Sequence, residues 1–262
     1  FLVLGVIIII MNVGLMFVHE PIETNRQEKQ KETDKIIAKK LGSNKFITNF
    51  FAYISGTIGG PVISFFKKNG FAIAAGILCF IFFFKIGEAF LGRMSIVFYK
   101  EIGFSKGQIA IYSKGLGWIT TVFFTLLGGI LAMRTGTIKT IFLAGGLMAV
   151  TNILFAILAW TGKSELLFSI AVIADDITAA FATVAFVAFI SLLVDRTYTA
   201  TQYALLASIG TAGRTTLASS SGALVDWLNG DWGIFFILTT IMVIPSLICL
   251  WLIRNKIKIV TN

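Results

Sequence analysis

The chain has 262 residues, of which 56% are hydrophobic and only 13% are charged, and its formal net charge is +9. Because soluble domains carry about 25% charged residues, the composition argues against a water-soluble enzyme or binding module. The basic residues gather in short segments beside long apolar runs, where a topology signal belongs, and this argues against nucleic-acid binding.

Several apolar runs are long enough to cross a bilayer, which takes about 20 residues. In chain order we predict membrane spans at Phe1–Phe17, Phe71–Phe98, Ile109–Leu131, Thr140–Trp160, Leu166–Val194, Thr199–Val225 and Trp232–Ile253. A hydrophilic linker rich in Lys and Glu, Glu20–Leu41, follows the first of these spans.

The segment Phe46–Phe66 could also span a bilayer, although it contains Gly59-Gly60-Pro61. If it does not span, nearly all Lys and Arg outside the spans fall on one side, and the other side receives only Lys100, Lys106 and Lys163. If it spans, this bias disappears. The positive-inside rule therefore predicts that Phe46–Phe66 is an interfacial helix on the cytoplasmic surface.

A short motif lies between the third and fourth predicted spans, Gly128-Gly129-Ile130-Leu131-Ala132-Met133-Arg134-Thr135-Gly136. It resembles the loop signature of the major facilitator superfamily, which joins the second and third helices of a six-helix half. Met133 replaces the usual acidic residue of that signature. One span, a basic cytoplasmic linker and six further spans is also the expected order for the second part of a 12-helix transporter.

The predicted fold is therefore an all-α integral membrane protein. It comprises the last transmembrane helix of an N-terminal half (1–18), a cytoplasmic central linker with an interfacial helix at 46–66 (19–70), a C-terminal six-helix transmembrane bundle (71–254) and a cytoplasmic tail (255–262). The missing N-terminal half of the same transporter and the lipid bilayer are expected partners.

Charged side chains inside membrane spans are costly, so each one needs a reason. Lys85 and Glu88 are three residues apart and share a helix face. They either neutralise each other inside the bundle or line a cavity, where Lys85 binds an anionic group and Glu88 exchanges protons. For Lys114 a substrate-binding role and snorkelling to the interface both remain open, whereas for Arg93 snorkelling is favoured.

Asp175 and Asp176 occupy the middle of their span, and adjacent helical residues point about 100° apart, so at most one of them faces a cavity squarely. Arg214 lies mid-span among small residues. It is expected to pair with Asp175, with Asp176 or with a substrate carboxylate.

Other reactive residues give no sign of enzymatic chemistry. Cys79 and Cys249 both lie in apolar runs without metal-ligand spacing, so we interpret them as free thiols. The only histidine, His19, lies at the cytoplasmic end of the first predicted span. No enzyme motif, metal site or cofactor is expected.

Several segments together resemble the AmpG family of muropeptide permeases. The segments are Lys85-Ile86-Gly87-Glu88-Ala89-Phe90, Lys114-Gly115-Leu116-Gly117, Ala185-Phe186-Val187-Ala188-Phe189, Ala200-Thr201-Gln202-Tyr203-Ala204-Leu205-Leu206 continuing to Gly213-Arg214, and Asp231-Trp232-Gly233-Ile234-Phe235-Phe236. The resemblance covers residues 71–253. The chain departs from the family at Glu88, where Asp is usual, and at Asp175-Asp176, where many members have Glu-Asn.

The resemblance implies a proton-driven importer in the bacterial inner membrane. It would carry N-acetylglucosaminyl-1,6-anhydro-N-acetylmuramyl peptides from the periplasm to the cytoplasm for cell-wall recycling, with the C-terminus cytoplasmic. The candidate substrate-binding residues for this anionic sugar-peptide are Lys85, Lys114, Gln202 and Arg214, and the candidate proton-coupling residues are Glu88, Asp175 and Asp176.

Two alternatives remain open. One is a major-facilitator transporter of another amphipathic or anionic solute, for instance of the acetyl-CoA-transporter type, although a CoA ester would call for more basic residues within the spans. The other is a non-transporting membrane sensor or scaffold, which would gain stability by losing its intramembrane charges.

Overall fold

The computed structural model describes residues 58–115, 117–195 and 198–257, together with Met11, Val13 and Gly14. The predicted first span, the hydrophilic linker, His19 and residues 46–57 of the predicted interfacial helix lie outside the described residues. By its internal contacts the chain divides into two units, Phe1–Gly60 and Pro61–Asn262, and the second unit holds the helical bundle.

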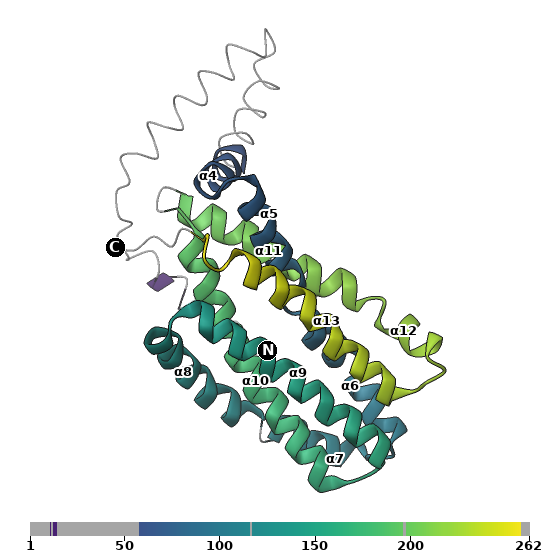
Figure 1. Ribbon diagram of the computed structural model, residues 1–262. Coiled ribbons are helices and arrows are strands. Elements are labelled where there is room, and N and C mark those ends of the chain that lie inside the picture. The colour runs from purple at the N-terminus through teal and green to yellow at the C-terminus, as the bar shows by residue number, and fades with distance from the viewer. Residues whose placement is uncertain (1–10, 12, 15–57, 116, 196–197, 258–262) are drawn as a thin grey trace. The chain divides into compact units, whose positions relative to one another are not determined.

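All regular elements among the described residues are helices (Figure 1). In chain order they are α4 (Gly60–Asn69), α5 (Phe71–Phe83), α6 (Ile86–Glu101), α7 (Lys106–Ala110), the π-helical turn η2 (Ile111–Gly115), α8 (Gly117–Thr135), α9 (Thr137–Thr161), α10 (Glu165–Leu193), α11 (Thr199–Ala218), α12 (Ser221–Trp227) and α13 (Trp232–Ile253).

Within the described residues, the predicted spans coincide with these helices to within a few residues except in three places. The span predicted at 71–98 contains a break, so that α5 ends at Phe83 and α6 begins at Ile86. The span predicted at 109–131 begins earlier, because Ser105 and Gln108 form a capping box that starts α7, and α8 continues to Thr135. The span predicted at 199–225 is divided into α11 and α12.

Within the described part of the chain, four helical segments are long and apolar enough to cross a membrane. They are Phe71–Glu101, Thr137–Thr161, Glu165–Leu193 and Trp232–Ile253. Helix α11 is missing from this set because Thr, Ser, Gln and Arg interrupt its apolar residues. Its polar side chains need surroundings other than lipid.

Glycines in the left-handed region of backbone space separate consecutive helices. Gly70 has φ +77° between α4 and α5, and Gly136 has φ +89° between α8 and α9. An L-residue would be strained at either position. Gly136 closes the motif that begins at Gly128, and this motif joins α8 to α9 as the sequence predicts.

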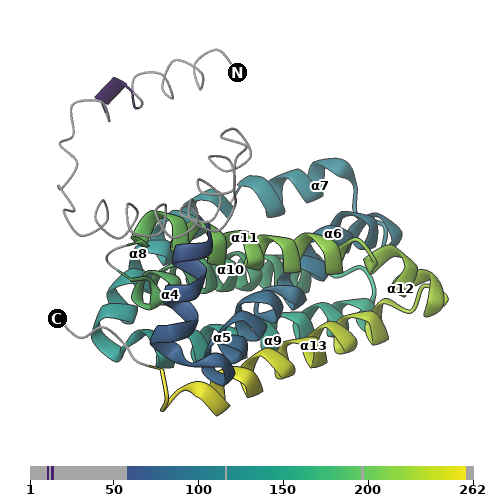
Figure 2. The same ribbon diagram turned by 90° about the horizontal axis from the view of Figure 1, so that it is seen from above.

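The helices of the bundle pack against one another in defined pairs. Helix α9 contacts both α10 and α13, α10 also contacts α8, and α5 contacts α13 and α11. Helix α11 packs along α5 and α6 and makes few contacts with α10. Figures 1 and 2 show the bundle from two directions.

Two aromatic-rich cores stabilise the bundle. The first, which we call the α4-side core, includes Phe65, Phe80, Phe84 and Phe189. The second, the α7-side core, includes Phe98, Phe104, Phe155, Phe168 and Phe236. Both cores receive residues from the α5–α6 pair, α9, α10, α11 and α13. Each of these elements therefore has a middle segment that belongs to neither core.

Candidate functional site

Polar side chains occupy the middle segments between the two cores, and we call them the polar belt. In these segments they are Lys85, Thr151, Asn152, Asp175, Asp176, Thr211 and Arg214, and we add Glu88 of α6 and Thr239 of α13, which lie beside residues of the α7-side core. Secondary transporters place substrate and ion sites near the bilayer midplane, where polar groups face a cavity and not lipid. The polar belt is therefore the candidate site.

The centre of the polar belt is the break between α5 and α6. Lys85 caps the N-terminus of α6 with φ −95° and ψ 15°, outside the helical region. Its Nζ lies 3.3 Å from Glu88 Oε2 and donates a hydrogen bond to Thr183 Oγ1 of α10 at 2.7 Å. The Lys85 and Glu88 side chains are only 13% and 14% exposed. An interrupted membrane helix with a charged pair at the interruption is the construction that transporters use to bind solutes and ions.

Arg214 reaches the same carboxylate from α11. Its guanidinium lies 3.9 Å from Glu88 Oε1, and its side chain is 50% exposed. The sequence predicts Asp175 or Asp176 as its protein partner, whereas the structure places Glu88 there, because α11 lies along α6 and touches α10 only lightly. One carboxylate thus lies between two cations, which leaves the cluster with a net positive charge.

The two aspartates of α10 have different surroundings. The Asp175 carboxylate is close enough to Glu88 for electrostatic interaction. Asp176 faces α8, where its Oδ2 lies 2.6 Å from the position a Cβ would take on Gly117. Gly117 therefore leaves room for the Asp176 carboxylate.

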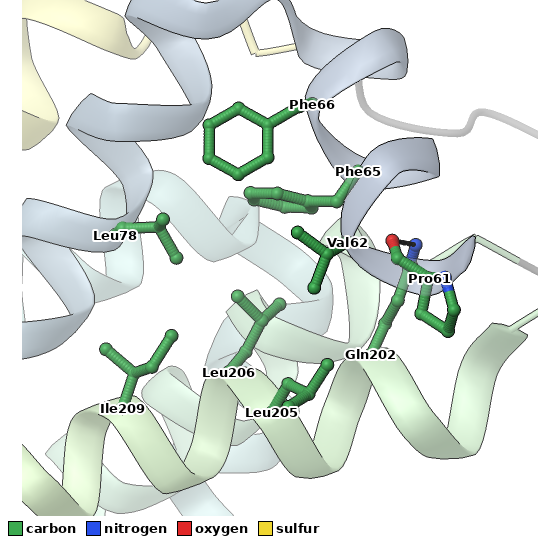
Figure 3. A pocket seen from close by; sticks show the side chains of 9 residues that line it. All are labelled: Pro61, Val62, Phe65, Phe66, Leu78, Gln202, Leu205, Leu206 and Ile209. Carbon is green, nitrogen blue, oxygen red and sulfur yellow. Dashed lines mark hydrogen bonds between the residues drawn. The ribbon is translucent and has the colours of Figure 1, made fainter. Parts of the chain in front are cut away.

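Gln202, a candidate substrate-binding residue, lies outside this cluster. Gln202 is 3% exposed, its Nε2 donates to Pro61 O at 2.9 Å, and its Oε1 accepts from Asp195 N at 2.6 Å. It also borders a small apolar cavity of about 130 Å³ between α4, α5 and α11, in which its amide rises from α11 to Pro61 (Figure 3). These contacts are those of a residue that holds helices together.

The structure also bears on the interpretations of Lys114 and Arg93. The backbone of Lys114 belongs to η2, and its side chain lies outside the described residues. Arg93, for which the sequence favours snorkelling, lines a cleft of about 430 Å³ between α6 and α11 together with Arg214. Its spacing from Glu88 gives no signal of this, because residues five apart on a helix point about 140° apart.

The long apolar helices around the polar belt define a class of protein, an all-α integral membrane protein. The Major Facilitator Superfamily model matches residues 1–216. The chain belongs to this superfamily.

Curated relatives narrow the comparison. The chain is 33% identical over 254 residues to the "Putative transporter AmpG 4" of Rickettsia conorii, covering 97% of this chain and 56% of that protein. It is 31% identical over 226 residues to the "Putative transporter AmpG 1" of Rickettsia prowazekii, covering 83% of this chain and 51% of the relative. It is also 29% identical over 199 residues to the "Anhydromuropeptide permease" of Escherichia coli K12, covering 76% and 40%. The chain thus spans about half the length of the curated relatives it matches.

Proposed function

We propose that this chain forms part of a proton-driven secondary transporter that imports anhydromuropeptides from the periplasm to the cytoplasm across the bacterial inner membrane, with its C-terminus cytoplasmic. The substrate class follows the relative named anhydromuropeptide permease. The remaining helices of a 12-helix transporter would complete the cavity, since cavities in this architecture form between two six-helix halves.

The observation that carries the proposal is the Lys85–Glu88–Arg214 cluster at the α5–α6 break. Removing either charge of a buried pair leaves the other uncompensated, so the cluster is costly to assemble and would be dispensable in a scaffold. Its excess positive charge suits an anionic sugar-peptide. Lys85 and Arg214 are the described residues that would bind the substrate's acidic groups, with Lys114 a further candidate.

Glu88 is the group we assign to proton exchange, assisted by Asp175. When Glu88 is ionised it attracts both Lys85 and Arg214. When it is protonated the two cations lose that partner, and each becomes available to a substrate carboxylate. Proton binding and substrate binding would then favour the same state of the cluster, which is the requirement for coupled import. Asp176 remains a candidate of the same kind on the α8 side.

The first test is uptake of radiolabelled anhydromuropeptide by the full-length protein in a permease-null Gram-negative strain, with and without a protonophore. Uptake that the protonophore abolishes supports the proposal. If protein that is folded in the membrane takes up no muropeptide, the substrate assignment fails, while membership of the superfamily stands.

Substitutions in the Lys85–Glu88–Arg214 cluster test its role in proton coupling separately from its role in substrate binding. Glu88→Gln keeps the shape of the side chain but cannot release a proton, so we expect accumulation against a gradient to disappear while exchange of internal for external muropeptide continues. Asp226→Asn, at an exposed carboxylate on α12, is the matched control and should leave both processes unchanged. Arg214→Ala should abolish uptake, and unchanged uptake in that variant contradicts the role given to the cluster.

A further inference from the structure

The cleft between α6 and α11 has two facing stripes of side chains. On α6 the lining residues include Ala89, Gly92 and Arg93, and on α11 they include Thr211, Arg214 and Thr215. Each set has the i, i+3, i+4 spacing of one helix face. Nothing lies within 4 Å of the position a Cβ would take on Gly92, and the two guanidinium groups supply the only charge among these six residues.

The arginines are not neutralised to the same degree. Arg214 has Glu88 at 3.9 Å, which is at the long end for an ion pair. Among the residues that the structure describes, Arg93 has no carboxylate oxygen within 4.0 Å, and it is exposed on a helix that is apolar enough to cross a membrane. An unneutralised cation in such a helix is costly, and facing a water-filled path with an anionic solute offsets that cost.

We propose that Arg93 and Arg214 together bind the carboxylates on the peptide part of the transported solute. Guanidinium groups bind carboxylates through two parallel N–H···O bonds, which a lysine cannot reproduce. Thr211 and Thr215 also line the cleft, and their hydroxyls donate to backbone carbonyls of α11 and keep lone pairs that can accept a hydrogen bond. Arg93 is thereby a specificity-determining residue that favours acidic peptides over neutral sugars, a role that rests on the proposed import of muropeptides.

The test compares two ligands on the purified full-length transporter in lipid nanodiscs. One is the anhydromuropeptide, and the other is the same molecule with its carboxylates converted to carboxamides. We expect wild-type protein to bind the acid at least tenfold more tightly than the carboxamide. Arg93→Gln should lose about tenfold in affinity for the acid and less than twofold for the carboxamide. Lys100→Gln, which removes an exposed cation from the same helix outside the cleft, should change neither affinity.

Arg93→Lys provides a second variant in case Arg93→Gln does not fold. Lysine retains the positive charge but cannot form the two parallel N–H···O bonds of a guanidinium. This variant should therefore bind the acid more weakly than wild type and more tightly than Arg93→Gln. If Arg93→Gln loses affinity for both ligands equally, or for neither, the inference is overturned although the transported substrate stands.

A dicarboxylate probe separates the inference from the substrate assignment. Glutarate should raise the thermal unfolding temperature of wild-type protein, and Arg93→Gln should abolish that rise. If wild type binds neither muropeptide nor its carboxamide but shows this Arg93-dependent response to glutarate, the carboxylate site stands and the proposed substrate fails. If no muropeptide binds and glutarate has no Arg93-dependent effect, both are overturned.

Discussion

Helices α11 and α13 are both long helices of the bundle, but their exposed faces have opposite chemistry. The exposed residues of α11 are small or polar, namely Thr199, Ala200, Ala204, Ser208, Thr211, Ala212, Arg214, Thr215 and Thr216. Those of α13 are entirely apolar, namely Ile234, Ile241, Ile244, Pro245, Ile248, Trp251 and Leu252. A face that meets lipid is apolar, whereas a face that meets water or another protein half can carry hydroxyls and charge. The comparison therefore assigns α13 to the lipid side of the bundle and α11 to a side that meets water or another part of the protein.

The buried faces of the two helices differ as well. Helix α13 approaches its neighbours through side chains, and Leu247 Cδ2 lies 2.6 Å from the position a Cβ would take on Gly145 of α9. Helix α11 approaches α5 through backbone, since a Cβ on Gly213 would overlap the carbonyl oxygen of Phe82 just before the α5–α6 break. The close approach of Gly213 thus holds the next residue, Arg214, beside the break.

The largest effect should come from placing a charge on each exposed face. Ile244→Arg puts a guanidinium on the lipid side of α13 and should cost about 2.5–3.5 kcal/mol of insertion free energy if the site is near the bilayer centre. Ser208→Arg on α11 should cost much less, because water or protein meets that face. The measurement is the amount of each full-length variant that is inserted and folded in the membrane. Equal losses for the two variants would break the assignment of the faces.

The second-largest effect should come from replacing the glycines at helix contacts, Gly213 of α11 and Gly145 of α9. Gly213→Ala forces a methyl group against backbone that cannot move aside, so we expect a loss of stability toward the upper end of the ~1–3 kcal/mol typical of overpacking. Gly145→Ala meets only the flexible end of Leu247 and should cost less than half as much. Thermal unfolding of the two purified variants measures the difference. A smaller loss for Gly213→Ala than for Gly145→Ala would contradict the backbone contact between α11 and α5.

A smaller difference in stability is expected between substitutions of a buried polar residue on α11 and on α13. Gln202→Ala removes hydrogen bonds to Asp195 and Pro61 and leaves those backbone groups without these partners, which should cost about 2 kcal/mol. Ser246→Ala on α13 removes only a bond to Val243 O within the same helix and should cost less than about 1 kcal/mol. Unfolding temperature and uptake are measured together. Unchanged stability with weaker substrate binding in Gln202→Ala would support the substrate-binding role expected from the sequence.

The sequence predicts the helices well where apolar runs are uninterrupted. Helix α13 has the predicted bounds Trp232–Ile253, because its composition is uniform and Asp231 caps its N-terminus by accepting a bond from Ile234 N. The same reasoning misses the break at Phe84–Lys85. Both sides of that break are helical and apolar. The contacts at the break that come from other helices, the hydrogen bond of Lys85 to Thr183 and the approach of Gly213 to Phe82, are tertiary.

Candidate charges can be found from sequence by their cost within a span, but their partners cannot. Lys85 and Glu88 are paired as their three-residue spacing predicts, since one helix turn fixes that distance. The pairing of Arg214 with Glu88, the inclusion of Arg93 in the cleft and the structural contacts of Gln202 all depend on which helices are neighbours. Neighbour relations among helices are set by packing and leave no local signal.

The smallest effect concerns the end of the bundle near the start of α11, where Lys68 of α4 donates to Leu193 O at 3.1 Å. Burial lowers the pKa of Lys68 below its usual value, and the nearby Asp195 carboxylate offsets part of that shift. The folded protein therefore releases this proton at lower pH than the unfolded chain does, and its contribution to the free energy of unfolding rises with pH between the lowered pKa and about 10.4, the ordinary value for lysine.

Lys68→Met removes this pH-dependent contribution to the free energy of unfolding. Thermal unfolding should therefore show that wild type becomes slightly more stable relative to Lys68→Met as the pH rises through this alkaline window. Lys67→Met removes an equal charge from the exposed side of α4 and controls for net charge. At the corresponding end of α13, Arg254 lies over the Trp251 ring at 5.4 Å, an arrangement suited to the interface of a lipid bilayer. A relative stability that falls with pH would mean that Asp195 stabilises the Lys68 ammonium by more than its burial costs, and α4 would then be held beside α11 by charge.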